Sequence, residues 1–270
     1  MPLRLPPLAP VTTALLPTDT LVSGVFMGVR ACDRLLLSIG QEKRSLFVAH
    51  AGGEGNPREA LSALNEWLPV WLAVVHAASV KSISSSVPCV FSWGDAPLSG
   101  GRFTLHHAPP LPYETAMLHV SGAVLNTHVA VRMLRDGGEP RTARVNIDKA
   151  LSHVAAAEKA LHMWTDTLGR ACAPTCLQGG GLEALRHWVM AWRHLAFAMA
   201  APSVTTAVPC ANAAAVSAHA AADTAVGLSC GEWREACRTL GDECRLAAAL
   251  VFADAQKGID LPQLGETRAF

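Results

Sequence analysis

Residues 87–134, VPCVFSWGDAPLSGGRFTLHHAPPLPYETAMLHVSGAVLNTHVAVRML, decide the expected fold of this chain. A short apolar run leads into Trp93, Gly94 and Asp95, and a Gly-rich turn follows. Tyr113 and Glu114 then open a long stretch with the apolar spacing of a helix. We predict a strand over 89–91 that pairs with 102–105, and a helix over 113–135 that ends at a Gly-Gly stop.

The rest of the chain shows helical spacing in one segment after another. Residues 1–18 are Pro-rich and predicted to be irregular, and residues 19–270 form one predicted domain. Further helices are expected from residue 19, from residue 58, and over 146–170, 182–200, 211–226 and 231–256. Pro202 and Pro209 are expected to bracket a linker. The predicted fold is all-α, an antiparallel helical solenoid or tetratricopeptide-like core with one small β-hairpin.

Composition restricts the classes of function. Half of the 270 residues are hydrophobic, and 22 basic residues balance 22 acidic ones. This content can fill a large core, and it gives no electrostatic reason to expect nucleic acid as a partner. We expect no transmembrane segment and no secretory signal, while a weak mitochondrial transit interpretation stays open. The eight cysteines are interpreted as reduced, buried thiols.

No catalytic or metal-binding pattern stands out. His119 and His128 are nine residues apart and so point to different sides of a helix, and Cys172 and Cys176 lack a second ligand pair at zinc-site spacing. Phosphate-binding loops and nucleophile elbows are also missing. We therefore expect no enzyme activity, no catalytic residues, no metal and no cofactor.

The order of motifs carries a resemblance to a known family. Trp93-x-Asp95 after a strand, then a helix that opens with Tyr113-Glu114 and continues through Gly122, resembles the Bro-one (BRO) domain of Alix-type endosomal adaptors. Several weaker motifs follow in the family's order over about residues 57–268. The chain departs from the pattern at Ser121, where the family has Asn, and it is shorter than family domains.

The resemblance implies a function and a binding site. It implies a cytoplasmic, endosome-associated scaffold or adaptor in endosomal sorting, protein transport or membrane remodelling, with peripheral membrane association through its partners. The implied partner is an amphipathic helix of an ESCRT-III-type subunit, docked by helix-in-groove recognition. The implied protein-binding residues are Phe197 with its helix neighbours Arg193 and Met190, and Ala213 and Ala214, where the family has large aliphatic residues. Asp95 is expected to cap a turn and Glu114 to lie in the first turn of its helix.

Two alternatives stay open. Phe197 can equally be a core residue. The stripe formed by Leu185, Trp188, Trp192, Leu195 and Met199 is typical of a core, although two tryptophans beside Arg193 also suit an interface. The chain can also be a structural helical subunit of a large, even organellar, assembly. Low charge and the two alanines favour that alternative.

Overall fold

The fold is seen in a computed structural model, which describes residues 42–43, 45–47, 56–80, 92–93, 104–105, 110–163, 175–226, 228 and 231–256. The elements are, in chain order, α3 (Pro57–Val80), β1 (Ser92–Trp93), β2 (Thr104–Leu105), α4 (Pro110–Arg135), α5 (Pro140–His162), the 3-10 helix η1 (Thr175–Leu177), α7 (Gly181–Met199), α8 (Val204–Thr224) and α9 (Gly231–Gln256). The described part is therefore helical apart from one short strand pair.

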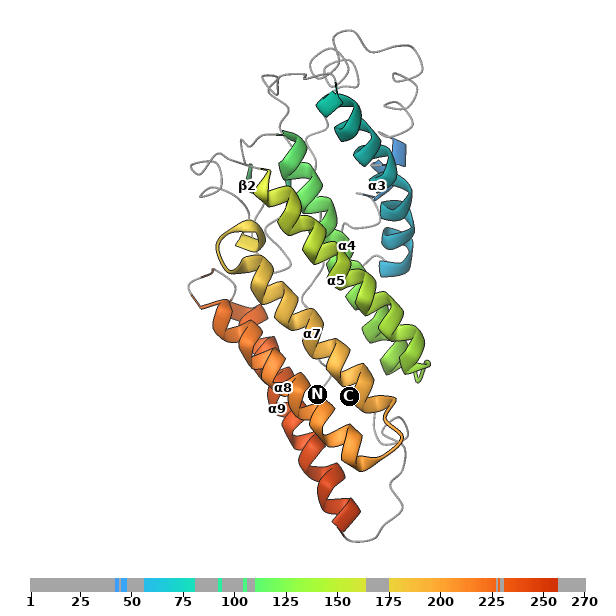
Figure 1. The fold of residues 1–270 in the computed structure, drawn as a ribbon, viewed down its shortest axis with the longest axis vertical. Helices are drawn as coiled ribbons and strands as arrows, with labels where there is room; N and C mark the ends of the chain where they lie inside the picture. The colour runs from blue at the N-terminus through green and yellow to red at the C-terminus, as the bar shows by residue number, and fades with distance from the viewer. Residues whose placement is uncertain are drawn as a thin grey trace.

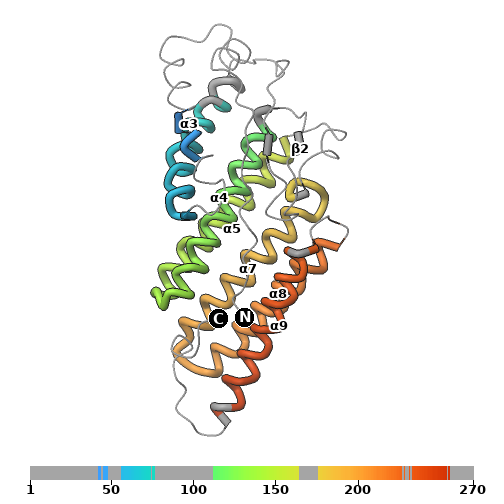
Figure 2. The backbone as a smooth tube through the Cα atoms, turned by 180° about the vertical axis from the view of Figure 1, so that it is seen from behind, coloured from blue at the N-terminus to red at the C-terminus, as the bar shows by residue number. Residues whose placement is uncertain are grey.

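The long helices lie in a staggered row, each packed mainly on its neighbours in the sequence. Figure 1 shows α3 at one edge, α4 and α5 next, then α7, and α8 with α9 at the other edge; Figure 2 shows the same order from behind. Along α5 and α7, Asp148 meets Arg193 while Arg144 meets Phe197. Residue numbers rise on one helix as they fall on the other, so the two helices are antiparallel. The expected all-α array of packed antiparallel helices is confirmed.

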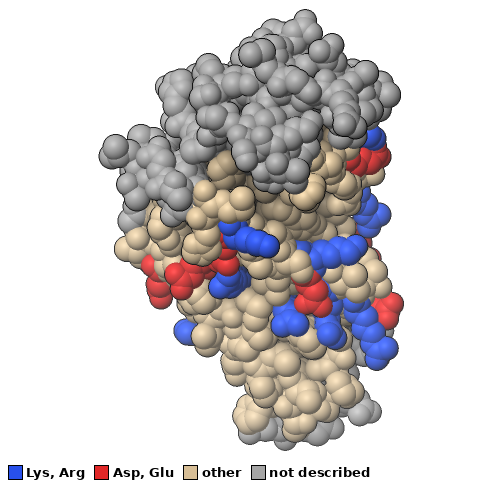
Figure 3. All heavy atoms as spheres, turned by 45° about the horizontal axis from the view of Figure 1, so that its top comes forward, with Lys and Arg blue, Asp and Glu red and all other residues tan. Residues whose placement is uncertain are grey.

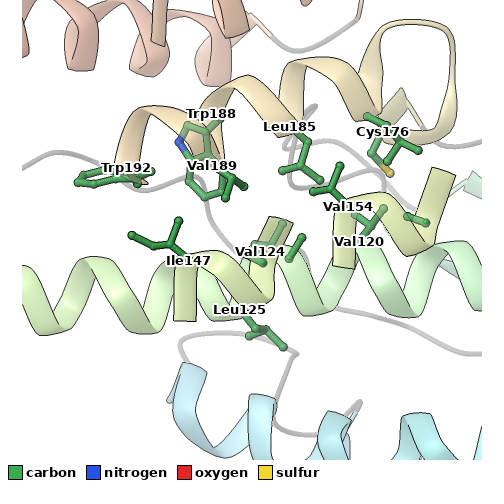
Figure 4. Close-up of a cluster of buried hydrophobic side chains, with 14 of the residues drawn as sticks. Val120, Val124, Leu125, Ile147, Val154, Cys176, Leu185, Trp188, Val189 and Trp192 are labelled. Carbon is green, nitrogen blue, oxygen red and sulfur yellow. The ribbon is translucent and has the colours of Figure 1, made fainter. Parts of the chain in front are cut away.

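α4 is the most deeply buried helix. Almost every residue from Tyr113 to Val131 is buried. Figure 4 shows Val120 and Val124 of α4 near side chains of α5 and α7, while Leu125 points away towards α3. Trp71 of α3 adds a hydrogen bond from its indole Nε1 to Thr115 Oγ1 at 2.9 Å. A helix enclosed on several sides buries polar side chains as well, and two of them, Asn126 and Thr127, donate hydrogen bonds to carbonyls one turn earlier. The first exposed charge after Glu114 is Arg132.

α5 begins six residues before the predicted start at residue 146. Glu139 is extended, and Pro140 takes the first helical position, where proline is well tolerated because its missing N–H has no helical partner. The core face then follows the helical period: Ala143, Ile147, Ala150, Val154, Ala157 and Ala160. Residues 164–174 lie outside the described part, so the predicted end of this helix is not covered.

The predicted linker between Pro202 and Pro209 is wrong. α8 begins at Val204, after the extended Ser203, and Pro209 lies inside it. The tight packing of the helix on both neighbours outweighs the local cost of one proline. The buried face of α8 is made of alanines alone, listed as Ala207, Ala211, Ala214, Ala215, Ala218, Ala221 and Ala222. Small side chains allow neighbouring backbones to approach closely.

The strands form only a minimal contact. Ser92 pairs with Leu105 and Trp93 with Thr104, antiparallel. The predicted strand over 89–91 lies outside the described residues, and the expected hairpin is limited to this two-residue pairing.

The structure describes four of the eight cysteines, all as free thiols: Cys176, Cys237 and Cys244 are buried, and Cys210 is half-buried. Cys237 and Cys244 lie seven residues apart on the buried face of α9. Burial raises the pKa of the Cys244 thiol to about 12, with Glu243 adding to the effect. These thiols act as small apolar side chains in a helix seam.

Candidate surface between α5 and α7

The structure describes the motif residues of the family resemblance only in part. Trp93 lies in β1, and Asp95 is outside the described residues. Tyr113 and Glu114 are both fully buried in α4. Glu114 does not occupy the first turn, because Pro110 already begins the helix and the first turn carries no acidic residue. Proline at a helix start is compatible with the backbone there, so the helix begins three residues before Tyr113.

The predicted binding residues of α7 do come together. Met190, Arg193 and Phe197 follow helical spacing and are all half-buried. The two alanines of α8 behave differently. Ala214 is fully buried in the core cluster, so a partner cannot contact it without unfolding, and Ala213 is half-buried. The predicted five-residue site therefore loses Ala214, while Met190, Arg193, Phe197 and Ala213 stay a prediction.

The α7 residues meet two charged residues of α5 that the sequence did not single out. The Arg144 guanidinium carbon lies 3.7 Å from the centroid of the Phe197 ring, and that of Arg193 lies 5.6 Å from the same centroid. Both distances are within cation–π range. Arg193 also donates from Nε to Asp148 Oδ1 at 2.8 Å. The aromatic ring is thus a platform for two arginines rather than an open apolar surface.

We define the α5–α7 strip as the residues at i, i+3, i+4 and i+7 spacing on the two helices. They are Arg141, Arg144, Val145 and Asp148 of α5, and Met190, Arg193, His194 and Phe197 of α7. The three arginines and one aspartate of the strip give it a net charge of +2. His194 adds no charge at neutral pH, because burial and then the nearby charge of Arg193 lower its pKa. Val145 is 54% exposed and supplies an apolar contact beside the charges.

Arg144 differs from Arg193 in its electrostatic pairing. Arg193 has Asp148 as its carboxylate. Among the described residues no carboxylate lies within ion-pair distance of Arg144, and its buried Nε makes no hydrogen bond. A guanidinium that stacks on a ring at one side and stays half-exposed can still receive a carboxylate from solvent.

The tryptophan stripe of α7 is core, as interpreted. Leu185, Trp188 and Trp192 are buried, and Leu195 and Met199 are half-buried and pack against the same core. Figure 4 shows Trp192 beside Ile147 of α5, and Leu185 pointing towards Val154. Trp188 lies 6.5 Å from Trp233 of α9, centroid to centroid. These side chains hold the helices beneath the strip in place and do not contribute to its surface.

Histidines form two separate contacts on α4. His119 Nδ1 lies 3.0 Å from His153 Nδ1 of α5, whereas His128 stands edge-on to Trp188 of α7 with centroids 6.1 Å apart. Burial lowers the pKa of His119 to about 4, with His153 adding to the effect. Burial also lowers the pKa of His128 to about 4, and the positive charges of Arg132 and Arg135 add to this effect. The two histidines face different helices, so they do not share a site.

The described residues contain no cluster of three or more His, Cys, Asp or Glu side chains arranged to hold a metal ion. None of the described helices combines the length and apolar character that a bilayer-spanning segment needs.

Comparison with protein-family models, with curated proteins and with solved structures finds no match to this chain.

The strip could have been found only in part from sequence. Met190, Arg193 and Phe197 share a helix and their spacing is visible. Arg144 and Asp148 are also one turn apart, but their place opposite α7 depends on the register between two helices separated by residues 163–180. No local pattern fixes that register.

Proposed function

We propose that this chain is a non-catalytic helical scaffold that binds a partner protein on the α5–α7 strip. The observation that carries the proposal is the half-exposed Arg144, which stacks on Phe197 and has no carboxylate partner among the described residues. Arginine and aromatic side chains are enriched at binding hot spots, because both combine a large contact area with directional interactions.

The setting follows from the motif residues. Trp93, Asp95, Tyr113 and Glu114 carry the resemblance to Bro-one domains, so the proposed partner is a helical segment of an ESCRT-III-type subunit in endosomal sorting or membrane remodelling. Helix-in-groove recognition needs contacts one turn apart. Arg141, Val145 and Asp148 of α5 provide that spacing at the surface, as do Met190, Arg193 and Phe197 of α7.

The test is a pull-down from native cell extract with the wild-type chain and Val145→Asp. Val145 is exposed, so the substitution alters the strip without opening the core. Val216→Asp on α8 is a matched control, because Val216 is also an exposed helical valine, at 63%. Loss of ESCRT-III-type subunits with Val145→Asp alone, repeated with the purified subunit, supports the proposal. Equal recovery of the same partners by all three proteins contradicts it.

The exposed apolar side chains of α9 favour a second function. Its C-terminal half exposes three large apolar side chains, Leu246, Leu250 and Phe252. Leu246 and Leu250 are one turn apart, on the side opposite the buried Cys237 and Cys244. This surface suits a fixed subunit of an assembly. In that case Leu250→Glu releases the chain from a high-mass complex in native extract, as measured by sedimentation, while Val145→Asp leaves it in place.

A further inference from the structure

We infer that the α5–α7 strip selects an acidic helical segment, and that Arg144 is the residue that receives its carboxylate. This inference rests on the proposed function and names the chemistry of the partner. It gives Phe197 a different role from the apolar anchor that the sequence suggested. The ring holds the guanidinium of Arg144, and the guanidinium makes the contact.

The first step is the geometry of the ring. Phe197 is half-buried and carries Arg144 at 3.7 Å from its centroid. A ring covered so closely by a guanidinium presents little free apolar area to a partner. The same stacking restricts the arginine side chain before binding, so less conformational entropy is lost when a carboxylate arrives.

The second step is the charge balance. Asp148 is the acidic member of the strip, and Arg193 already binds it at 2.8 Å. Arg141 and Arg144 leave the strip with a net positive charge, although the whole chain is neutral. Figure 3 shows that basic and acidic side chains are interspersed on the face in view, so selectivity comes from the local arrangement rather than from one broad field.

The third step is the shape of the partner. Val145 is exposed next to Arg144, and Met190 is half-buried one turn before Arg193. A partner helix with a Leu and a Glu one turn apart would place its apolar side chain near Val145 while its carboxylate meets Arg144. The fitting partner is thus an amphipathic helix with acidic residues bordering its apolar face.

The test uses two synthetic helical peptides of about 20 residues. One alternates Leu and Glu at helical spacing, and the other carries Gln at each Glu position. Binding to the full chain is followed by side-chain Nε–Hε NMR signals of arginine, up to about 1 mM peptide. We expect the Glu peptide to bind about three- to tenfold more tightly and to shift the Arg144 signal.

Variants of two residues make the test specific. Arg144→Gln is expected to abolish the preference for Glu, whereas Arg58→Gln, an exposed arginine on α3, is expected to retain it. Phe197→Leu keeps an apolar side chain but removes the ring. It is expected to shift the free Arg144 signal and to weaken the preference. A thermal melt of each variant verifies folding.

The outcomes separate the two proposals. Equal binding of both peptides overturns the acidic preference while leaving the strip as a docking surface. Binding of neither peptide also overturns the acidic preference, and the pull-down with Val145→Asp then decides the proposed function by itself. A preference for Glu that survives in Arg144→Gln shows that another basic residue carries it and contradicts the role of Arg144.

Discussion

At the residue scale, a glycine sets the distance between α4 and α5. A Cβ added at Gly122 would lie 2.7 to 2.9 Å from three ring atoms of His153, including Cγ near the backbone. No L side chain fits there unless the histidine moves. Gly122 therefore permits a contact that the helical pattern of the sequence does not reveal.

Gly122→Ala is expected to destabilise the fold by about 1–2 kcal/mol, because overpacking outweighs the better helix propensity of alanine. Gly241→Ala is expected to cost less, since its added Cβ meets only the outer ring atoms of His219. Gly231→Ala, with nothing nearby, is the neutral control. Urea unfolding measures all three. A cost for Gly122→Ala that persists undiminished in a His153→Ala background would show that the clash is not its cause.

The His119–His153 contact predicts how stability depends on pH. Burial, and then His153, lower the pKa of His119 from 6.5 to about 4. Burial lowers the pKa of His153 as well, with Lys149 adding to the effect. The unfolded chain then binds more protons than the folded chain between these pKa values. Stability is therefore fully present above pH 6.5 and falls as the pH drops towards 4.

The variant His119→Gln is expected to reduce this loss, because glutamine retains hydrogen-bonding groups but does not titrate. The measurement is the free energy of unfolding at several pH values for both proteins. His128 keeps part of the slope in the variant, since its pKa is also lowered to about 4 by burial. Parallel pH profiles for wild type and His119→Gln would contradict a contribution from the histidine pair.

At the element scale, α8 keeps a proline that local rules would exclude. Pro209 is exposed in the second turn, and its missing N–H leaves the Thr205 carbonyl without its usual helical donor. Pro209→Ala is expected to stabilise the protein by about 1–3 kcal/mol. Pro202→Ala, before the helix, is expected to change little. Thermal melts compare the two, and a destabilised Pro209→Ala would mean that the proline has a favourable role in the native helix.

The same element shows what sequence reasoning can and cannot reach. The stops at Gly137–Gly138 and the span of α9 were predicted closely, because glycines and apolar periods are local signals. Pro209 misled the prediction, since the alanines that bury α8 act through its neighbours. Pro140 was overlooked as a helix start for a related reason: proline suits only the first turn of a helix, and no local signal showed that this turn begins after Glu139.

In the candidate site, too, local spacing could be predicted from the sequence and packing between helices could not. Phe197, Arg193 and Met190 lie on one helix, so their spacing identified them. Arg144 contributes through the register of α5 against α7, and that register is set by core pairs such as Ile147 with Trp192 (Figure 4). Ala214 was predicted as a partner contact, but it is buried. The prediction failed because residue type alone does not tell which side of an alanine-rich helix faces its neighbours.

At the scale of the whole molecule, the row of helices predicts a gradient of local stability. α4 packs on α3, α5 and α7, whereas the end helices α3 and α9 pack mainly on α4 and on α8 respectively, and α9 leaves Leu246 and Leu250 exposed. In such a row an end helix can open without disturbing the far end, while a central helix opens only when several interfaces break. Amide hydrogen exchange followed by mass spectrometry is expected to be slowest in α4 and α5 and faster in the two end helices, α3 and α9.

The Gly122→Ala variant tests whether the helices of the row open independently of one another. It weakens the α4–α5 interface alone, so exchange should accelerate in α4 and α5 while α9 keeps its wild-type rate. Gly231→Ala at the start of α9 is the reference that should leave both ends unchanged. Equal acceleration in all helices would mean that the row unfolds as one cooperative unit. The exposed face of α9 could then not open independently of the core formed by α4, α5 and α7.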